Sequence, residues 1–328
     1  MVSATEKAVV GRPLGGAAVR RARALLLRSE ALRGYLLLSP TLLVMVGMMI
    51  APMVALVALS FWTQVYFDLD TSFTLQNYWT IVRPSATAAY FLGIPFYFAT
   101  PIYAILLVKS VLMSLVATMA VVLLAYPMAY FLAFRVTRHK LVWLILITVP
   151  FWTSYLLRVF AWKVILGFNG VINSGLIALG LIDAPLEFLL YNPTAVVITL
   201  AHAWAAFAIL PIYVSLEKID RSLLEAATDL GDNPVQRFLR VTLPLSMPGT
   251  IAASLLVFIP TVGDYVTPTL VGGTSGIMIG NVIQSLFGKA NNAPLGAAVS
   301  IVSMLVITAL VCAFLWAVGQ GRTRRRGA

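Results

Sequence analysis

The stretch from Glu225 to Pro244, EAATDLGDNPVQRFLRVTLP, is a compact charged segment between two long apolar runs. Its first half predicts a short helix, because leucine and alanine recur at helical spacing before Gly231, a residue type that often ends helices. Its second half predicts another helix, capped by Asn233 and started by Pro234. We expect Leu243-Pro244 to stop this second helix before the next apolar run.

The start of the first helix matches a capping box. The Ser222 hydroxyl is expected to accept from the Glu225 backbone N–H, and the Glu225 carboxylate from the Ser222 backbone N–H. Small side chains at Ala226 and Ala227 would allow close approach by a neighbour, and Gly231 is expected to be left-handed. The residues alone leave open whether the segment is a docking element or an ordinary amphipathic connector.

Composition places the chain in a membrane. Its 328 residues are 60% hydrophobic and only 11% charged, whereas soluble proteins cover their surface with charged residues. A helix needs about 20 apolar residues to cross a bilayer. Six runs meet that requirement: Tyr35–Phe61, Leu106–Phe134, Leu141–Leu166, Thr194–Leu216, Gly249–Leu270 and Pro294–Val318. They predict an all-α transmembrane fold.

The net charge of +11 reports topology rather than nucleic-acid binding, because no aromatic-interleaved basic surface accompanies it. Most of the 23 basic residues fall in the N-terminal tail and after the second, fourth and sixth spans. Cytoplasmic loops carry such an excess, so both termini are predicted to be cytoplasmic and the tails to attract anionic lipid. The predicted layout is a basic tail (1–34), a transmembrane domain (35–319) containing a cytoplasmic loop (218–247), and a second basic tail (320–328).

The segment Trp62–Tyr103 is predicted to lie outside, on the membrane surface. It contains Pro95 and Pro101, and a seventh span there would place the C-terminal arginines outside, against the charge rule.

The residues Glu225, Ala226, Ala227, Gly231, Val241, Leu243 and Pro244 have the spacing of the cytoplasmic EAA loop of binding-protein-dependent ABC importer permeases, which the chain resembles. Further stretches resemble the spermidine/putrescine permease branch: Tyr126–Ala133, Pro150–Arg158, Ala161-Trp162, Leu210-Pro211, Gly263–Pro268 and Gly272-Gly273. The resemblance implies a six-helix type I importer permease, with a five-helix core and an additional N-terminal helix, in the bacterial inner membrane.

The resemblance also implies the partners. The EAA loop would form a coupling helix that docks on an ATPase subunit, which holds ATP and Mg; this chain has no phosphate-binding loop and needs no cofactor of its own. A second, related permease and an extracytoplasmic substrate-binding protein complete the importer. The substrate implied is a polyamine, with another small amino or phosphonate compound as the alternative. The residues expected to couple to the ATPase are Ser222, Glu225, Ala226, Ala227, Asp229, Gly231, Leu243 and Pro244.

Two charged residues within the spans are candidates for the translocation pathway, because charges at membrane depth are rare. Asp264 and Arg158 are both expected toward the outer leaflet, near a gate and as a possible pair; an ordinary helix end at Asp264 is the alternative. Tyr265 and Trp152 could stack on an ammonium group, or could belong to the aromatic belt of the membrane interface. The few ionisable residues elsewhere in the spans disfavour a secondary transporter, and no catalytic or metal-binding set indicates an enzyme.

Overall fold

The computed structural model describes residues 30–189 and 191–326, and the chain divides into two units, 1–58 and 59–328. The helix α2, Glu30–Ser60, forms the described part of the first unit and contains Pro40 and Pro52. Residues 1–29 of the predicted N-terminal tail and the last two residues of the C-terminal tail lie outside the described range.

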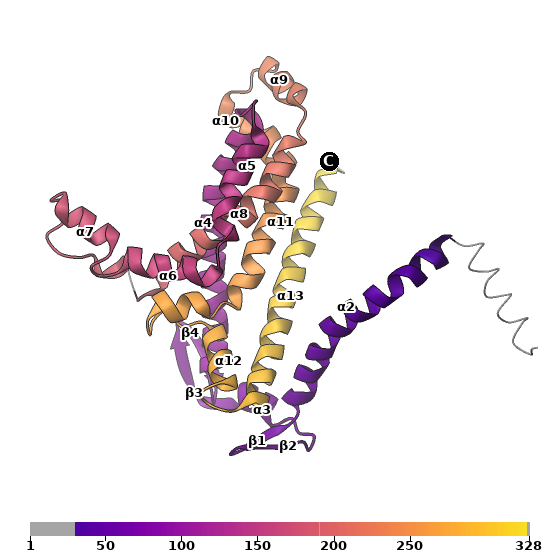
Figure 1. Cartoon of the computed structure of the whole chain (residues 1–328), viewed down its shortest axis with the longest axis vertical. Helices are drawn as coiled ribbons and strands as arrows, with labels where there is room; N and C mark the ends of the chain where they lie inside the picture. The colour runs from indigo at the N-terminus through magenta and orange to yellow at the C-terminus, as the bar shows by residue number, and fades with distance from the viewer. Residues whose placement is uncertain (1–29, 190, 327–328) are drawn as a thin grey trace, which may run out of the picture. The chain divides into compact units, whose positions relative to one another are not determined.

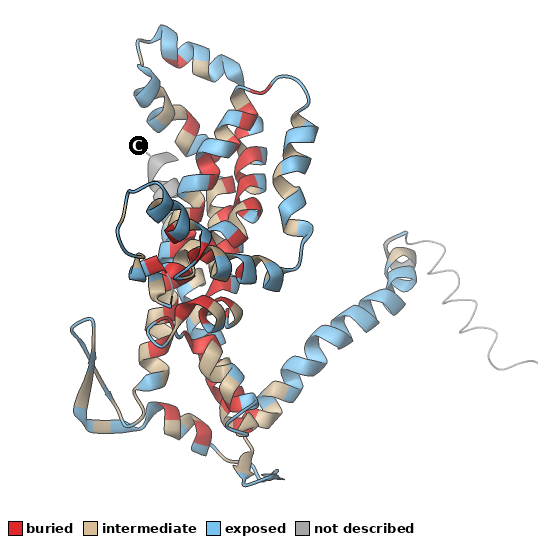
Figure 2. Ribbon diagram, turned by 60° about the vertical axis from the view of Figure 1, so that its left-hand side comes forward, coloured by how far each residue is buried: buried red, intermediate tan, exposed pale blue. Residues whose placement is uncertain are grey.

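Three long helices form the centre of the second unit: α4 (Ile102–Phe134), α8 (Pro193–Glu217) and α11 (Leu243–Val262). The helix α8 packs against both α4 and α11, and Figure 2 shows the buried residues concentrated along these helices. Their shared core is rich in small residues such as Ala125, Ala129, Ala208 and Ala253. Small side chains let helix backbones approach closely, which is how helices associate in lipid.

Gly249 shows how close this approach is. A Cβ at this position would lie 2.4 Å from the Pro211 carbonyl oxygen and from the Ser215 Cβ. The Gly249 N–H also donates to the Ser215 hydroxyl over 3.3 Å. Glycine is therefore required where α11 crosses α8.

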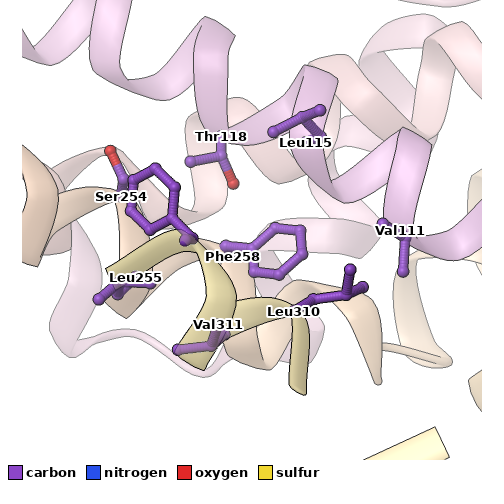
Figure 3. A pocket seen from close by; sticks show the side chains of 9 residues that line it. Val111, Leu115, Thr118, Ser254, Leu255, Phe258, Leu310 and Val311 are labelled. Atoms are coloured by element: carbon purple, nitrogen blue, oxygen red, sulfur yellow. The ribbon is translucent and has the colours of Figure 1, made fainter. Parts of the chain in front are cut away.

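The last helix, α13 (Ala293–Arg326), contributes to a small cavity with α4 and α11. The cavity has a volume of about 180 Å³, and Figure 3 shows it lined mainly by apolar side chains, with Thr118 and Ser254 among them. Such a lining would not stabilise a charged ligand.

Shorter elements connect the long helices (Figure 1). They are β1 (Thr63–Val65), β2 (Asp68–Asp70), α3 (Gln76–Val82), β3 (Pro84–Phe91), β4 (Ile94–Phe98), α5 (Lys140–Thr148), η1 (Val149–Trp152), α6 (Tyr155–Leu166), α7 (Val171–Ala178), η2 (Glu187–Leu189), α9 (Arg221–Asp229), α10 (Pro234–Arg237), η3 (Phe238–Thr242), η4 (Pro268–Gly272) and α12 (Ile279–Phe287).

The predicted fold class is confirmed, since six helical segments in the described residues are long and apolar enough to cross a membrane. The third predicted span, Leu141–Leu166, is wrong as a single helix. It breaks between η1 and α6, where Thr153 and Ser154 are extended, and the segment long enough to span is Tyr155–Ala178. Pro150, which cannot donate a helical hydrogen bond, lies earlier, in η1, where the α-helical turns of α5 give way to a 3₁₀ turn.

The fifth span also differs from its prediction, Gly249–Leu270. The helical run starts at Pro234 and ends at Val262, so Leu243-Pro244 continues the helix instead of stopping it. The residues before Pro244 form a π-helix, η3, in which the Leu243 N–H donates to the Phe238 carbonyl. This wider turn accommodates a proline that lacks an N–H.

The segment Trp62–Tyr103, which the sequence predicts to lie outside, contains two antiparallel hairpins that were not predicted. Strand β1 pairs with β2, and β3 pairs with β4. Between them, α3 is held by Asn77, whose side-chain amide donates to the carbonyls of Ser60 and Trp62 over 2.9 and 2.7 Å.

Candidate functional site

The helix α9 stands at one end of the second unit, at the top of Figure 1, and begins differently from the predicted capping box. Asp220 is the N-cap, and its carboxylate accepts from the Ser222 backbone N–H over 3.0 Å. Ser222 lies inside the helix, so the predicted Ser222–Glu225 box is wrong. Hydrogen bonds from the backbone and hydroxyl of Ser222 hold the pKa of the Asp220 carboxyl below its usual range.

Gly231 ends α9 as predicted. Its φ is +90°, and two hydrogen bonds close the turn: Gly231 N–H to the Thr228 carbonyl over 2.9 Å, and Asp232 N–H to the Ala227 carbonyl over 3.0 Å. This pair of bonds is the Schellman motif, which needs a left-handed residue at the position of Gly231. The turn is therefore fixed by backbone geometry.

The second short helix begins at Asn233 as predicted, and here a capping box is present. The Asn233 side chain accepts from the Gln236 N–H over 2.9 Å, and the Gln236 side chain accepts from the Asn233 N–H over 3.0 Å. The guanidinium of Arg240 pairs with Asp232 over 2.7 Å, and that of Arg237 donates to the Thr228 hydroxyl over 2.8 Å. These side-chain bonds hold α9 and α10 in contact with each other.

The loop is also joined to the membrane helices. Phe238 packs edge-on against Tyr126, with ring centroids 5.6 Å apart and an interplanar angle of 88°, and lies 6.3 Å from the Tyr130 ring. The Tyr126 hydroxyl and the Ser246 hydroxyl are buried and 2.6 Å apart. These contacts connect η3 and α11 to α4.

The predicted coupling residues divide by exposure. Ser222, Glu225, Ala226, Asp229 and Gly231 are exposed, and Ala227 is buried against the rest of the loop. Glu225 and Asp229 line an open groove of about 480 Å³ beneath α9, together with three arginines, Arg135, Arg221 and Arg237. Leu243 and Pro244 lie at the start of α11, away from the exposed face of α9.

A second cluster surrounds Asp264, where the chain leaves α11. Its carboxylate is buried and accepts from the Tyr155 hydroxyl over 2.5 Å, the Thr267 hydroxyl over 2.6 Å and the Val266 N–H over 2.9 Å. Gly280 of α12 packs on this break, since a Cβ there would meet the Gly263 carbonyl at 2.6 Å. Asp264 thus ties together α6, η4 and the end of α11.

Arg158 lies one helical turn after Tyr155 on α6. Its guanidinium donates to the Ala203 carbonyl over 2.9 Å, and its central carbon lies 4.8 Å from the Phe151 ring centroid and 5.8 Å from that of Tyr155. Arg158 and Asp264 do not pair with each other: the two ion pairs among the described residues are Lys140–Glu217 and Arg240–Asp232. The Tyr155 side chain lies between the two charged groups.

The side chains of the other two pathway candidates, Trp152 and Tyr265, make none of the hydrogen bonds described for Asp264 and Arg158. Trp152 is 81% exposed at the end of η1, and Tyr265 is 47% exposed. The sequence analysis did not single out Tyr155, Thr267 or Phe151. Thr267 follows Asp264 by three residues, a spacing that could have indicated the local hydrogen bond, whereas the Tyr155 contact joins residues 109 positions apart.

Comparison with known proteins assigns a family. Residues 110–325 match the family described as binding-protein-dependent transport system inner membrane component. The spermidine/putrescine transport system permease protein PotB of Escherichia coli is 40% identical over 216 residues, covering 66% of this chain and 78% of that protein. PotB of Haemophilus influenzae is 43% identical over 211 residues, covering 64% and 73%.

A more distant relative and one solved structure extend the comparison. The inner membrane ABC transporter permease protein YdcU of Escherichia coli is 34% identical over 259 residues, covering 75% of this chain and 80% of that protein. A bacterial ABC transporter that imports the acidic polysaccharide alginate superposes with a TM-score of 0.61 at 17% identity, covering 92% of this chain and 99% of that one. At this identity the superposition supports the fold alone. By its sequence match and its fold, the chain belongs to the family of inner membrane components of binding-protein-dependent transport systems.

Proposed function

We propose that this chain is the permease subunit of an ATP-driven importer of polyamines such as spermidine and putrescine. The main support for the proposal is the sequence similarity to PotB. Both PotB proteins described above are spermidine/putrescine transport system permeases. A buried carboxylate, Asp264, followed in the chain by the exposed ring of Tyr265, is chemistry suited to a polyamine, which is cationic. Permeases for other small amino or phosphonate compounds are the alternative.

The family match supports a multi-pass protein of the bacterial inner membrane. We place α9 and both termini in the cytoplasm, because Arg135, Arg221, Arg237 and Arg240 gather at the α9 end. The chain itself performs no chemistry in this proposal. ATP and Mg belong to a partner ATPase that docks on the exposed face of α9, and a substrate-binding protein delivers polyamine outside.

Coupling follows from how the loop is built. The ATPase moves α9, and the Schellman turn and the Asn233 cap pass this motion to α10 without bending. The helical run from Pro234 to Val262 then carries it to Asp264 at the outer side. A second, related permease would face this one and complete the pathway.

Asp264, Tyr155 and Arg158 form the outer gate in this proposal. The carboxylate is held by two hydroxyl groups, which a substrate ammonium could replace as hydrogen-bond donors. Arg158 stays on the Ala203 carbonyl and the Phe151 ring, where its positive charge would favour onward release of a cation. Trp152 and Tyr265 would contact substrate at the entrance.

The test measures uptake of labelled putrescine and spermidine in cells whose other polyamine importers are deleted. Two variants act at one residue: Gly231→Pro cannot reach a φ of +90°, whereas Gly231→Asn tolerates left-handed geometry. We expect uptake to be lost on deletion and in Gly231→Pro, and largely kept in Gly231→Asn at equal amounts of membrane protein. Unchanged uptake after deletion would exclude polyamines as the substrate, and equal loss in both variants would contradict the role of the turn.

A further inference from the structure

The β3–β4 hairpin lies outside the region that matches the family, residues 110–325. Phe91 pairs with Ile94, and the intervening Leu92 and Gly93 have φ values of +50° and +80°. Positive φ at both central residues is typical of a type I′ turn, the two-residue turn whose twist matches the right-handed twist of the flanking strands. In Figure 1 the hairpin lies at the end of the second unit opposite α9, and none of its residues is buried.

The hairpin is uncharged, and its half nearest the turn, residues 88–98, is apolar on both faces. From Pro84 to Val108 the sequence contains no Asp, Glu, Lys, Arg or His. Paired residues project to the same side of a hairpin, so one face carries Phe91, Ile94 and Phe96, and the other carries Tyr90, Pro95 and Tyr97. A hairpin with one face in water alternates apolar and polar residues; in this hairpin the polar residues of the strands, Ser85 and Thr87, lie near the base, and the half nearest the turn has no such alternation.

Several apolar side chains of this half are also exposed. Leu92 at the turn is 73% exposed, and Tyr90 is 71% exposed. The other hairpin provides an internal contrast, because its exposed Phe67 is followed directly by Asp68 and, two residues later, by Asp70. Exposed aromatic residues are therefore accompanied by charge in β1–β2 but not in β3–β4.

The base of the hairpin lies close in the chain to a membrane-spanning helix. Strand β4 ends at Phe98, and α4, a span with a mean hydropathy of 2.3, begins at Ile102. Residues 99–101 alone therefore separate the base of the hairpin from the first residue of this span. The depth that the tip can reach is limited, because an isolated two-stranded hairpin leaves unpaired backbone groups on both edges, which cannot enter hydrocarbon.

From these observations we infer that the β3–β4 hairpin is an interfacial anchor, which lies in the outer leaflet with Leu92 and Ile94 among the lipid headgroups and upper acyl segments. Tyrosine and other aromatic residues favour this zone, where ring and backbone remain within reach of water. The anchor would hold the outer end of α4, against which α12 is fixed by the bond from the Ile279 N–H to the Ser110 hydroxyl over 2.7 Å.

The experiment is possible because Cys312 is the single cysteine of the chain, so its replacement leaves a background without thiols. In a Cys312→Ser background, Leu92→Cys and the matched tip variant Phe67→Cys are spin-labelled, and the full chain is placed in nanodiscs of phosphatidylethanolamine and phosphatidylglycerol. Collision of each label with oxygen, which concentrates in lipid, is compared with collision with a water-soluble nickel chelate. Alkylation of the unlabelled thiols by a membrane-impermeant maleimide in intact cells gives a second measurement.

We expect the Leu92→Cys label to collide preferentially with oxygen and the Phe67→Cys label with the nickel chelate, and the Leu92→Cys thiol to be alkylated more slowly. Equal access of the nickel chelate to both labels would overturn the inference. Protection of Leu92→Cys that develops only after the substrate-binding protein is added would also overturn it, because the surface would then bind protein rather than lipid.

Discussion

At the scale of single residues, the carboxylate of Asp264 is held by the hydroxyls of Tyr155 and Thr267. Asp264→Asn removes the charge that strengthens both bonds, and hydrogen bonds to charged groups contribute about 1.5–3 kcal/mol. We expect Asp264→Asn and Tyr155→Phe each to reduce uptake while the complex still assembles. Since both changes disrupt one bond, the double variant should be little worse than either single variant. Normal uptake in Asp264→Asn, or fully additive losses, would contradict the gate.

The cap of α9 gives a second prediction for single residues. Because Asp220 and not Ser222 is the N-cap, Asp220→Ala should impair coupling more than Ser222→Ala. Ser222→Ala keeps the backbone N–H that donates to the Asp220 carboxylate. The ratio of substrate transported to ATP hydrolysed in the purified complex measures this. Greater loss in Ser222→Ala would show that the hydroxyl, through the predicted box with Glu225, governs the helix start.

The same cap has a pH dependence of known sign. The folded-state pKa of Asp220 is lowered, so its stabilising contribution is fully present above the ordinary carboxyl pKa and is lost as pH falls through the lowered value. We therefore expect the coupling ratio to be insensitive to this group at neutral pH.

At the scale of elements, the crossing of α8 and α11 depends on Gly249. An added methyl at this position would overlap the Pro211 carbonyl, and overpacking of a tight core costs about 1–3 kcal/mol. Gly249→Ala should lower the thermal stability of the purified protein in detergent. Gly175→Ala in α7 is the control, because no atom lies within 4 Å of the added methyl and the stability should not fall. Equal stability of the two variants would contradict the close crossing.

The sequence predicted correctly those features whose interactions lie within a few residues of each other. Gly231 was predictable because a left-handed turn selects glycine, and the Asn233 cap because its partner lies three residues away. The start of α9 was missed because Asp220 and Ser222 both have capping chemistry, and spacing alone does not select between them. The break before α6 and the Tyr155–Asp264 bond depend on tertiary packing, which an apolar run does not encode.

At the scale of the whole molecule, α11 separates the two candidate sites. Its 20 residues extend about 30 Å at 1.5 Å per residue, close to the thickness of a bilayer core. In the mechanism we propose, an effect of the ATPase on Asp264 is transmitted over this length of helix. The aromatic contact of Phe238 with Tyr126 joins α4 to the same helical run at the end nearest α9.

The source of energy is the last prediction. Transporters driven by ion gradients bind the coupling ion near the membrane midplane, and α4 and α11 contain no Asp or Glu while α8 contains one only at its end, Glu217. In proteoliposomes holding this chain, its partner permease and the ATPase, with the substrate-binding protein supplied on the outer side, uptake should require ATP and should persist when a protonophore dissipates the proton gradient. A matched preparation with a hydrolysis-deficient ATPase should be inactive. Uptake by this chain alone, abolished by the protonophore, would instead make it a secondary transporter and would remove the function we assign to α9.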